Sequence, residues 1–360
     1  MFVSGLPKWS LIAFAVVAGA HAGDGVSVDS RRGEELFQTL PCIRCHTING
    51  KGGSKGPDLA KRLRSEYSPA GIAARMWNHA PAMWSALEQD GLSVEPIGNQ
   101  AAADLFGYFY ALRLIERPAN ASRGKGLFES EGCLQCHATD DSEKAGTPVS
   151  RWTTLGRPLE FAVSIWGHID DKRAKRTKLS GQELSDIVAF ARSLPKAPTA
   201  PMRMDAERAG GAELLDAKGC STCHKAKSDL ARKLRTKSVN DLAAAMWNHN
   251  KGGDSFTLNS DERQQIVSHL WTQQVLEPAG DMDAGREVFE ARCAACHSGS
   301  GVAPALVGRR GKVSVSSIVS SLWTHGPQML KRLKANNSEW PTFTTDQMAD
   351  VITFLNAGGR

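Results

Sequence analysis

The sequence lacks cysteine outside one repeated motif and lacks a long apolar run after residue 22. All eight cysteines belong to that motif, so no thiol remains for chemistry elsewhere in the chain. No later segment has the roughly 20 consecutive apolar residues that a transmembrane helix needs. We therefore expect no integral membrane span.

The N-terminal residues have the composition of a secretory signal. Lys8 precedes an apolar run from Leu11 to Ala20, and Ala20-His21-Ala22 forms a small-residue cleavage site before polar sequence. The run is too short for an uncleaved anchor. We expect residues 1–22 to be removed after Ala22, which leaves a soluble, exported protein, located in the bacterial periplasm.

The motif Cys-x-x-Cys-His occurs four times. The copies are Cys42-Ile43-Arg44-Cys45-His46, Cys133-Leu134-Gln135-Cys136-His137, Cys220-Ser221-Thr222-Cys223-His224 and Cys293-Ala294-Ala295-Cys296-His297. This spacing is typical of c-type haem attachment: two thiols one helical turn apart form thioethers to the vinyl groups, and the adjacent imidazole points at the iron. One copy alone could instead be a zinc knuckle or a redox dithiol. Four copies, each followed by histidine, predict four covalent haems with His46, His137, His224 and His297 as proximal ligands.

The charge and the aromatic content agree with this cofactor. The formal net charge is +6, and four haems with two propionates each would offset it. The basic excess is therefore no sign of a nucleic-acid or membrane partner, and we expect no nucleic-acid partner. Three tyrosines stand against nine tryptophans, a bias that suits packing around a flat macrocycle.

Each copy lies between two segments of helical character. Glycine stands four residues before a bulky apolar residue ahead of each motif, which would let two helices cross closely; the pairs are Gly33–Phe37, Gly124–Phe128, Gly211–Leu215 and Gly285–Phe289. Amphipathic runs follow at 102–112, 182–194, 261–271 and 346–355, with Ser180, Ser260 and Thr345 as N-cap candidates.

This plan resembles the class I cytochrome c family in four tandem copies over residues 27–360. The resemblance implies a mostly α fold of four small helical domains, each around one covalent haem. Proline-bearing joints place the domains at 23–117, 118–198, 199–278 and 279–360. Repeats one and three look closest, because 58–64 matches 229–235 and both lead into Met-Trp-Asn-His. We interpret this similarity as a duplicated two-haem half.

The methionine that class I cytochromes place before the closing helix is absent from all four repeats; repeat four has Trp340 there. A Trp-x-His element recurs instead, with apolar residues on the histidine face of the helix. We predict the distal iron ligands to be His79, His168, His249 and His325. Met83 and Met329 are alternatives for haems one and four, because Pro81 and Pro327 favour a turn that would swing the thioether onto the iron.

Residues around the ligands can also be assigned from the sequence. In the family a proline carbonyl accepts the proximal imidazole N–H; Pro57 and Pro304 fit this role, Pro148 fits it less well, and repeat three has Ser228 instead. The four Trp-x-His tryptophans, Trp77, Trp166, Trp247 and Trp323, are interpreted as packing or as conduits at a haem edge. The basic runs 172–176 and 331–334 are either solvated surface or a docking patch for an acidic redox partner.

The leading functional hypothesis is an electron-transfer protein that carries electrons between redox partners and has no catalytic residues. Two alternatives stay open. The chain could be the cytochrome subunit of a larger respiratory or dehydrogenase complex. It could also be a haem enzyme, a peroxidase or an oxyanion reductase, with an open iron position in repeat three.

Overall fold

The structure is a computed structural model that describes residues 26–60, 68–114, 119–168, 177–198, 203–206, 210–224, 230, 233–234, 237–249, 258–299, 303–309 and 311–358. The expected signal segment, 1–22, lies outside these residues. The described chain is mostly helical, as predicted. Its β structure there consists of two antiparallel pairs, β1 (Val28–Asp29) with β4 (Asp205–Ala206) and β2 (Thr47–Ile48) with β3 (Lys51–Gly52).

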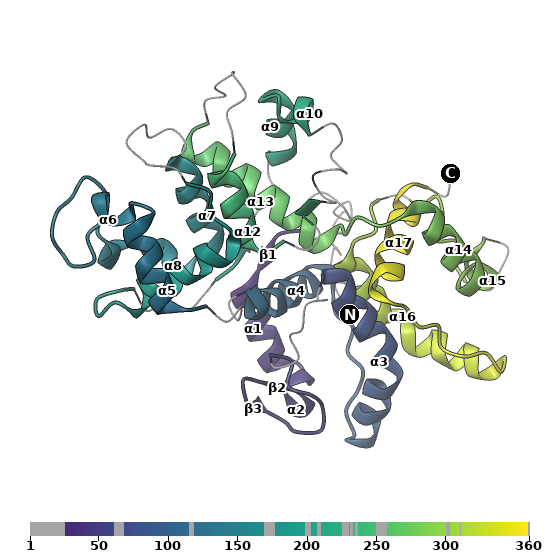
Figure 1. The fold of residues 1–360 in the computed structure, drawn as a ribbon. Coiled ribbons are helices and arrows are strands. Elements are labelled where there is room, and N and C mark those ends of the chain that lie inside the picture. The colour runs from purple at the N-terminus through teal and green to yellow at the C-terminus, as the bar shows by residue number, and fades with distance from the viewer. Residues whose placement is uncertain are drawn as a thin grey trace, which may run out of the picture.

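Each of the four repeats contains an opening helix, a one-turn helix at the cysteine motif, a helix with Trp-x-His and a closing helix (Figure 1). Repeat one has α1 (Ser30–Thr39), α2 (Cys42–Cys45), α3 (Pro69–Gln89) and α4 (Asn99–Leu114). Repeat two has α5 (Ala121–Ser130), α6 (Cys133–Cys136), α7 (Pro158–Gly167) and α8 (Gly181–Ser193), with 3₁₀ turns at Val149–Arg151 and Thr153–Gly156. Repeat three has α9 (Gly211–Ala217), α10 (Cys220–Cys223), α12 (Val239–Trp247) and α13 (Ser260–Leu276). Repeat four has α14 (Met282–Arg292), α15 (Ala294–His297), α16 (Val315–Ala335) and α17 (Thr345–Asn356).

The opening and closing helices cross at the glycine of the opening helix. A β-carbon at Gly33 would stand 2.0 Å from the carbonyl oxygen of Asp104, and one at Gly124 would stand 1.9 Å from that of Asp186. Four residues on, Phe37 and Phe128 are buried beside the crossing. The same close approach occurs at Gly211 and Gly285. The crossing predicted from the glycine spacing is confirmed.

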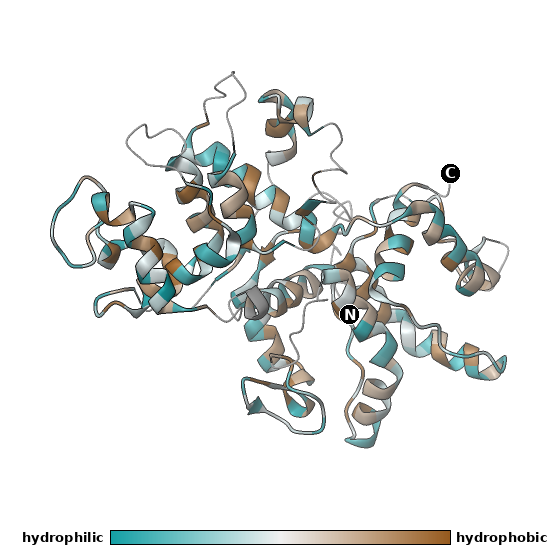
Figure 2. Cartoon of the chain, viewed as in Figure 1, coloured by the Kyte–Doolittle hydropathy of each residue, from teal (hydrophilic) through white to brown (hydrophobic). Residues whose placement is uncertain are grey.

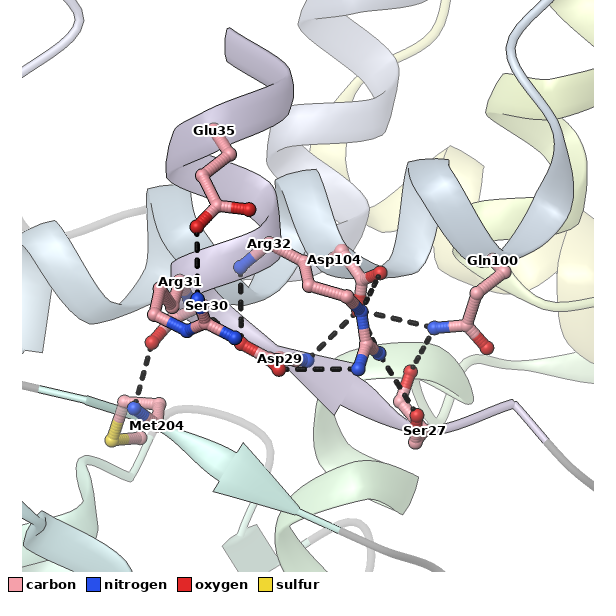
Figure 3. Close-up of polar contacts among 9 residues, drawn as sticks. All are labelled: Ser27, Asp29, Ser30, Arg31, Arg32, Glu35, Gln100, Asp104 and Met204. Atoms are coloured by element: carbon pink, nitrogen blue, oxygen red, sulfur yellow. Dashed lines mark hydrogen bonds and ion pairs between the residues drawn. The ribbon is translucent and has the colours of Figure 1, made fainter. Parts of the chain in front are cut away.

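A carboxylate of the closing helix holds the start of the opening helix. The N–H of the N-cap residue Asp29 donates to Asp104 Oδ1 at 2.9 Å, and Arg32 Nε donates to Asp104 Oδ2 at 2.9 Å (Figure 3). The same N-cap contact recurs from Asn120 to Asp186 and from Asp281 to Asp350. These bonds tie the first and last helices of a repeat together.

The N-caps of the closing helices were partly predicted. Ser180 caps α8 as expected. For α13 and α17 the prediction was wrong by one residue, because the caps are Asn259 and Thr344 rather than Ser260 and Thr345. In each case the side chain of the earlier residue accepts the N–H three positions on, which the later residue cannot reach from inside the helix.

The repeats pair in space as one with four and two with three. Helix α3 packs against α16 and α17, and α16 also packs against α4. The corresponding helices of the other pair make the same contacts: α12 packs against α7 and α8, and α7 also packs against α13. Figure 1 shows these two groups of helices on opposite sides of the molecule.

Repeats one and three join the two pairs through equivalent residues. Val28 of β1 pairs with Ala206 of β4, and Val28 lies as far before Gly33 as Ala206 lies before Gly211. The rings of Tyr110 and Trp271 lie 4.6 Å apart at equivalent positions of α4 and α13. Equivalent residues contact each other only at a two-fold axis, so the two halves are related by an approximate two-fold rotation. This relation supports the duplication inferred from the sequence, and the repeats follow one another in space as four, one, three, two.

The apolar core lies where these helices meet. Buried Leu242, Ile266, Trp271 and Ile352 belong to one cluster that extends through all four repeats. Figure 2 shows apolar residues gathered on α7, α12 and α13, while the loop beside α6 is mostly hydrophilic. The cysteine motifs therefore stand on small helices outside a shared helical framework.

Candidate haem sites

Each cysteine motif folds as a single helical turn. The histidine N–H donates to the carbonyl of the first cysteine in all four copies, at 2.9 Å for His46, 2.8 Å for His137, 2.9 Å for His224 and 2.9 Å for His297. None of the eight cysteines, all of which the structure describes, forms a disulfide. Both sulfurs of each motif are thus held on one turn, which is the arrangement that two thioether bonds to one porphyrin need.

The first thiol of each motif faces inward. Burial raises the pKa of Cys42, Cys133 and Cys293 to about 11, and burial also raises the pKa of Cys220. These sulfurs pack against the apolar core, where burial disfavours the thiolate. Without haem, these cysteines would therefore be neutral thiols at pH 7.

Backbone carbonyls orient three of the proximal imidazoles. His46 Nδ1 lies 3.0 Å from Pro57 O and His297 Nδ1 lies 2.9 Å from Pro304 O, as predicted. In repeat two the assignment to Pro148 was wrong: the partner of His137 Nδ1 is the carbonyl of Thr147, at 2.7 Å. A carbonyl only accepts, so Nδ1 carries the proton and Nε2 is left free to bind a metal.

Repeat three differs in this respect. His224 Nδ1 is buried and has no hydrogen-bond partner among the described residues. Ser228, where the other repeats have their orienting carbonyl, lies outside the described part of the chain. A buried ring nitrogen without such a bond holds the imidazole less firmly.

A glycine beside the proximal imidazole was missed in the sequence. A β-carbon at Gly56 would stand 2.6 Å from His46 Nδ1, and one at Gly146 would stand 2.8 Å from His137 Nδ1. Each glycine directly precedes the residue whose carbonyl orients the ring. The sequence contains this glycine before the orienting residue in two repeats, as Gly56-Pro57 and Gly146-Thr147. In repeat four the residue before Pro304 is Ala303, so the pattern does not extend to all repeats.

Trp152 is a second residue that the sequence did not reveal. Its Nε1 donates to the Thr147 carbonyl at 2.9 Å, and its ring stands edge-on to that of His137 at 5.0 Å. Burial lowers the pKa of His137; the bond to Thr147 opposes this shift and the nearby His168 adds to it. The imidazole is therefore neutral at pH 7, the form that binds a metal.

In repeats two and three the structure brings the proximal and expected distal histidines together. The ring centres of His137 and His168 are 5.8 Å apart, and those of His224 and His249 are 6.5 Å apart. An iron about 2 Å from each nitrogen would separate two ring centres by roughly 6 Å. His168 Nδ1 lies 2.9 Å from Ser164 O, which leaves its Nε2 for the gap. These residues fit a haem iron between two imidazoles.

In repeats one and four the two histidines are not in ring contact. His79 and His325 are exposed on α3 and α16, and neither ring contacts the proximal imidazole of its own repeat, although the structure describes all four residues. His79 Nδ1 lies 2.8 Å from Arg75 O. The imidazole is oriented by its own helix, with Nε2 directed away from that carbonyl.

The turn expected at Pro81 and Pro327 does not occur. Both prolines lie inside helices, because α3 runs from Pro69 to Gln89 and α16 from Val315 to Ala335. Pro81 cannot donate to the carbonyl of Trp77, and Trp340 Nε1 of repeat four donates to it instead, at 3.0 Å. Met83 packs against a cluster that contains Trp84 and Leu322.

The residues before His79 and His249 bind the neighbouring repeat. Asn248 Nδ2 donates to Leu179 O at 2.6 Å and Leu179 N donates to Asn248 Oδ1 at 3.0 Å, while Trp247 Nε1 donates to Thr177 O at 2.7 Å. In the other pair the same three bonds run from Asn78 to Phe343 and from Trp77 to Pro341. Trp77 and Trp247 therefore pack between repeats, which accounts for the Trp-Asn-His shared by repeats one and three.

The segments that accept these bonds, in repeats two and four, directly precede the closing helices α8 and α17. In repeat four this segment contains Trp340, which stands where class I cytochromes have methionine, and its ring stacks on Trp77 at 5.3 Å and 29°.

Of the two basic runs, 172–176 lies outside the described residues. Lys331 and Lys334 are exposed near the end of α16.

Two segments of the chain match models of known families. Residues 280–355 match cytochrome c oxidase, cbb3-type, subunit III, and residues 30–88 match cytochrome c. No curated protein and no solved structure matches the chain. Among the described helices, none is both long and apolar enough to cross a membrane. The two matches support a c-type cytochrome, and they imply covalent haem c in a protein that binds haem and transfers electrons.

Proposed function

We propose that the chain is an exported, periplasmic tetrahaem cytochrome that carries electrons between redox proteins through four domains, with the boundaries given above. The observation that carries this proposal is the pairing of imidazoles in repeats two and three, at 5.8 and 6.5 Å. If each pair of imidazoles held one haem iron, no coordination position would remain for a substrate, and the iron could only change its oxidation state.

Haem iron supplies a one-electron couple when bound. The eight cysteines and His46, His137, His224 and His297 would hold it. The carbonyls of Pro57, Thr147 and Pro304 fix the tautomer of three of these rings. Buried side chains such as Phe37 and Phe128 exclude water beside the motif. Rings held in this way move little when the charge changes, which favours fast electron transfer.

We assign His79, His168, His249 and His325 as the distal ligands. Met83 and Met329 remain the alternatives at haems one and four, where the rings are exposed. The continuity of α3 through Pro81 and the packing of Met83 against the Trp84 cluster favour His79. Near-infrared magnetic circular dichroism of Met83→Leu tests this choice, because a methionine-ligated haem would lose its charge-transfer band and a histidine-ligated haem would keep its spectrum.

The test of the proposal is the replacement of single distal histidines. His168→Ala and His249→Ala should each convert one of four low-spin haems to a high-spin form. His269→Gln is the control, because this buried histidine lies outside all four motifs. Low-spin spectra that do not change in both alanine variants would contradict the ligand assignment.

The match of residues 280–355 to a subunit of a cbb3-type oxidase favours a second candidate, a cytochrome subunit of a larger redox complex. The electron-transfer chemistry would be the same. Size-exclusion chromatography of the native protein from its host separates the two, since a complex would elute far above a single 38.8 kDa chain. An enzyme with an open iron in repeat three is disfavoured by the contact between His224 and His249.

A further inference from the structure

The sites of repeats two and three are joined by an aromatic side chain. The ring of Trp247 lies 5.8 Å from that of His168, at 47°. Trp247 belongs to repeat three and stands two residues before His249, whereas His168 belongs to repeat two. The indole therefore touches the expected distal ligand of one haem and is linked by two peptide units to that of the next.

Trp247 is fixed in this position. Its side chain is buried, at 7% exposure. Its Nε1 donates to Thr177 O at 2.7 Å, and the adjacent Asn248 makes two bonds to Leu179. Both partners belong to repeat two. The contact between the indole and His168 thus rests on three hydrogen bonds that cross the same interface.

The other pair of repeats has its own aromatic contact. Trp77, equivalent to Trp247, stacks on Trp340 of repeat four at 5.3 Å. Trp84 stands edge-on to Trp340 at 5.6 Å and to Trp323 at 6.4 Å. Trp323 lies two residues before His325. Aromatic rings therefore span from the expected distal ligand of repeat one to that of repeat four.

We propose that electrons pass between the haems of repeats two and three through Trp247, so that the four haems exchange electrons in the spatial pairs two–three and one–four rather than in chain order. This inference rests on the proposed function. In each step one electron leaves a ferrous site and reduces a ferric site. The indole only mediates the coupling: it is neither oxidised nor reduced, and no proton moves.

The pairing places repeats two and four at the ends of the series. Repeats one and three contact each other through Val28–Ala206 and Tyr110–Trp271. Electrons that enter at one end would traverse the sites in the order two, three, one, four.

Exchange spectroscopy by NMR on the partly reduced wild-type protein tests the pairing. Haem signals of sites one, two and three can be assigned through the His79→Ala, His168→Ala and His249→Ala variants. Exchange between sites two and three should be faster than exchange between sites one and two. Faster exchange between sites one and two would overturn the proposal, and this comparison needs no tryptophan variant to fold.

Variants of Trp247 test the role of the indole. Trp247→Leu should retain four haems and lose the fast exchange between sites two and three. Trp247→Phe keeps a smaller aromatic ring and loses the bond to Thr177, so it should keep most of that exchange. Trp166→Leu is the matched control at the same motif position in repeat two. Fast exchange that persists in Trp247→Leu would overturn the role of Trp247, whereas fewer than four haems in the wild-type protein would contradict the proposed function and the pairing with it.

Discussion

Trp340 donates its indole N–H to the carbonyl oxygen of Trp77, at 3.0 Å, in the position where a helical N–H would stand if residue 81 were not proline. A residue of repeat four thereby replaces a hydrogen bond missing inside a helix of repeat one. The interface between the two repeats and the continuity of α3 depend on the same contact.

This relationship predicts coupling between Trp340 and Pro81. Trp340→Phe keeps the stacked ring and leaves the Trp77 carbonyl without its donor, at a cost of about 1 kcal/mol. In a Pro81→Ala background the helix supplies its own N–H, so the same substitution should cost less. Urea denaturation of the four proteins in a double-mutant cycle measures the coupling. Additive effects would show that the indole bond does not substitute for the helical one.

Asn248→Ala should disturb the site of repeat three as well as stability. The substitution removes both bonds to Leu179, a buried residue, and costs about 2 kcal/mol. Because His249 follows directly, we also expect a high-spin fraction at one haem. Asn240→Ala is the control: Asn240 also bonds repeat two, through Ser185 Oγ at 2.8 Å, but lies at the start of α12, whereas His249 follows its end. Equal spectra for the two variants would argue against a positioning role for Asn248.

Gly56→Ala should displace the proximal imidazole of repeat one. The added β-carbon would stand 2.6 Å from His46 Nδ1, so the ring or the Gly56 segment must move. We expect less haem bound per chain or a weakened low-spin signal. Gly98→Ala is the matched control in the same repeat, because nothing lies within 4 Å of its β-carbon position. Wild-type haem content and spectra in Gly56→Ala would contradict the close contact.

Asp186 should make the stability of repeat two depend on acid pH. Burial raises the pKa of Asp186, but the bonds from Arg123, from the N–H of Asn120 and from Gln182 outweigh it, and the pKa is lowered overall. A carboxyl with a depressed folded pKa stabilises the fold above its unfolded pKa of about 3.9, and this stabilisation is lost as the pH falls through the folded value. Asp186→Asn should flatten this dependence when denaturation midpoints are compared between pH 6 and pH 3. Parallel curves for the two proteins would show that Asp186 does not contribute.

The local features of the fold could be predicted from the sequence. The crossing at Gly33 follows from the spacing of glycine and Phe37 on one helix face, and the carbonyl partners Pro57 and Pro304 follow from short fixed loops. Such features depend on residues close together in the chain. The N-caps Asn259 and Thr344 lie one residue before the predicted ones. Sequence alone does not decide between them, because either of two adjacent residues could accept the helical N–H.

The pairing of repeats could not be predicted in this way. The bonds between Asn78 and Phe343 join residues far apart in sequence, and no periodicity of either segment indicates the partner. For the same reason Pro81 looked like a helix end: the group that compensates for its missing N–H is Trp340. One feature of the sequence does reflect the arrangement: repeats one and three share Trp-Asn-His. The sequence alone does not show that the tryptophan and the asparagine bond to a neighbouring repeat.

The central claim is that four haems are attached and that those of repeats two and three are held between His137 and His168 and between His224 and His249. Low-temperature EPR of the oxidised protein, quantified per iron and combined with the intact mass, tests this most directly. We predict an intact mass that includes four covalent haems, and low-spin signals of iron with two imidazole ligands from repeats two and three. His168→Ala should remove the low-spin signal of repeat two, and His249→Ala that of repeat three. A stoichiometric high-spin signal from either repeat in the unmodified protein, or fewer than four attached haems, would contradict the account.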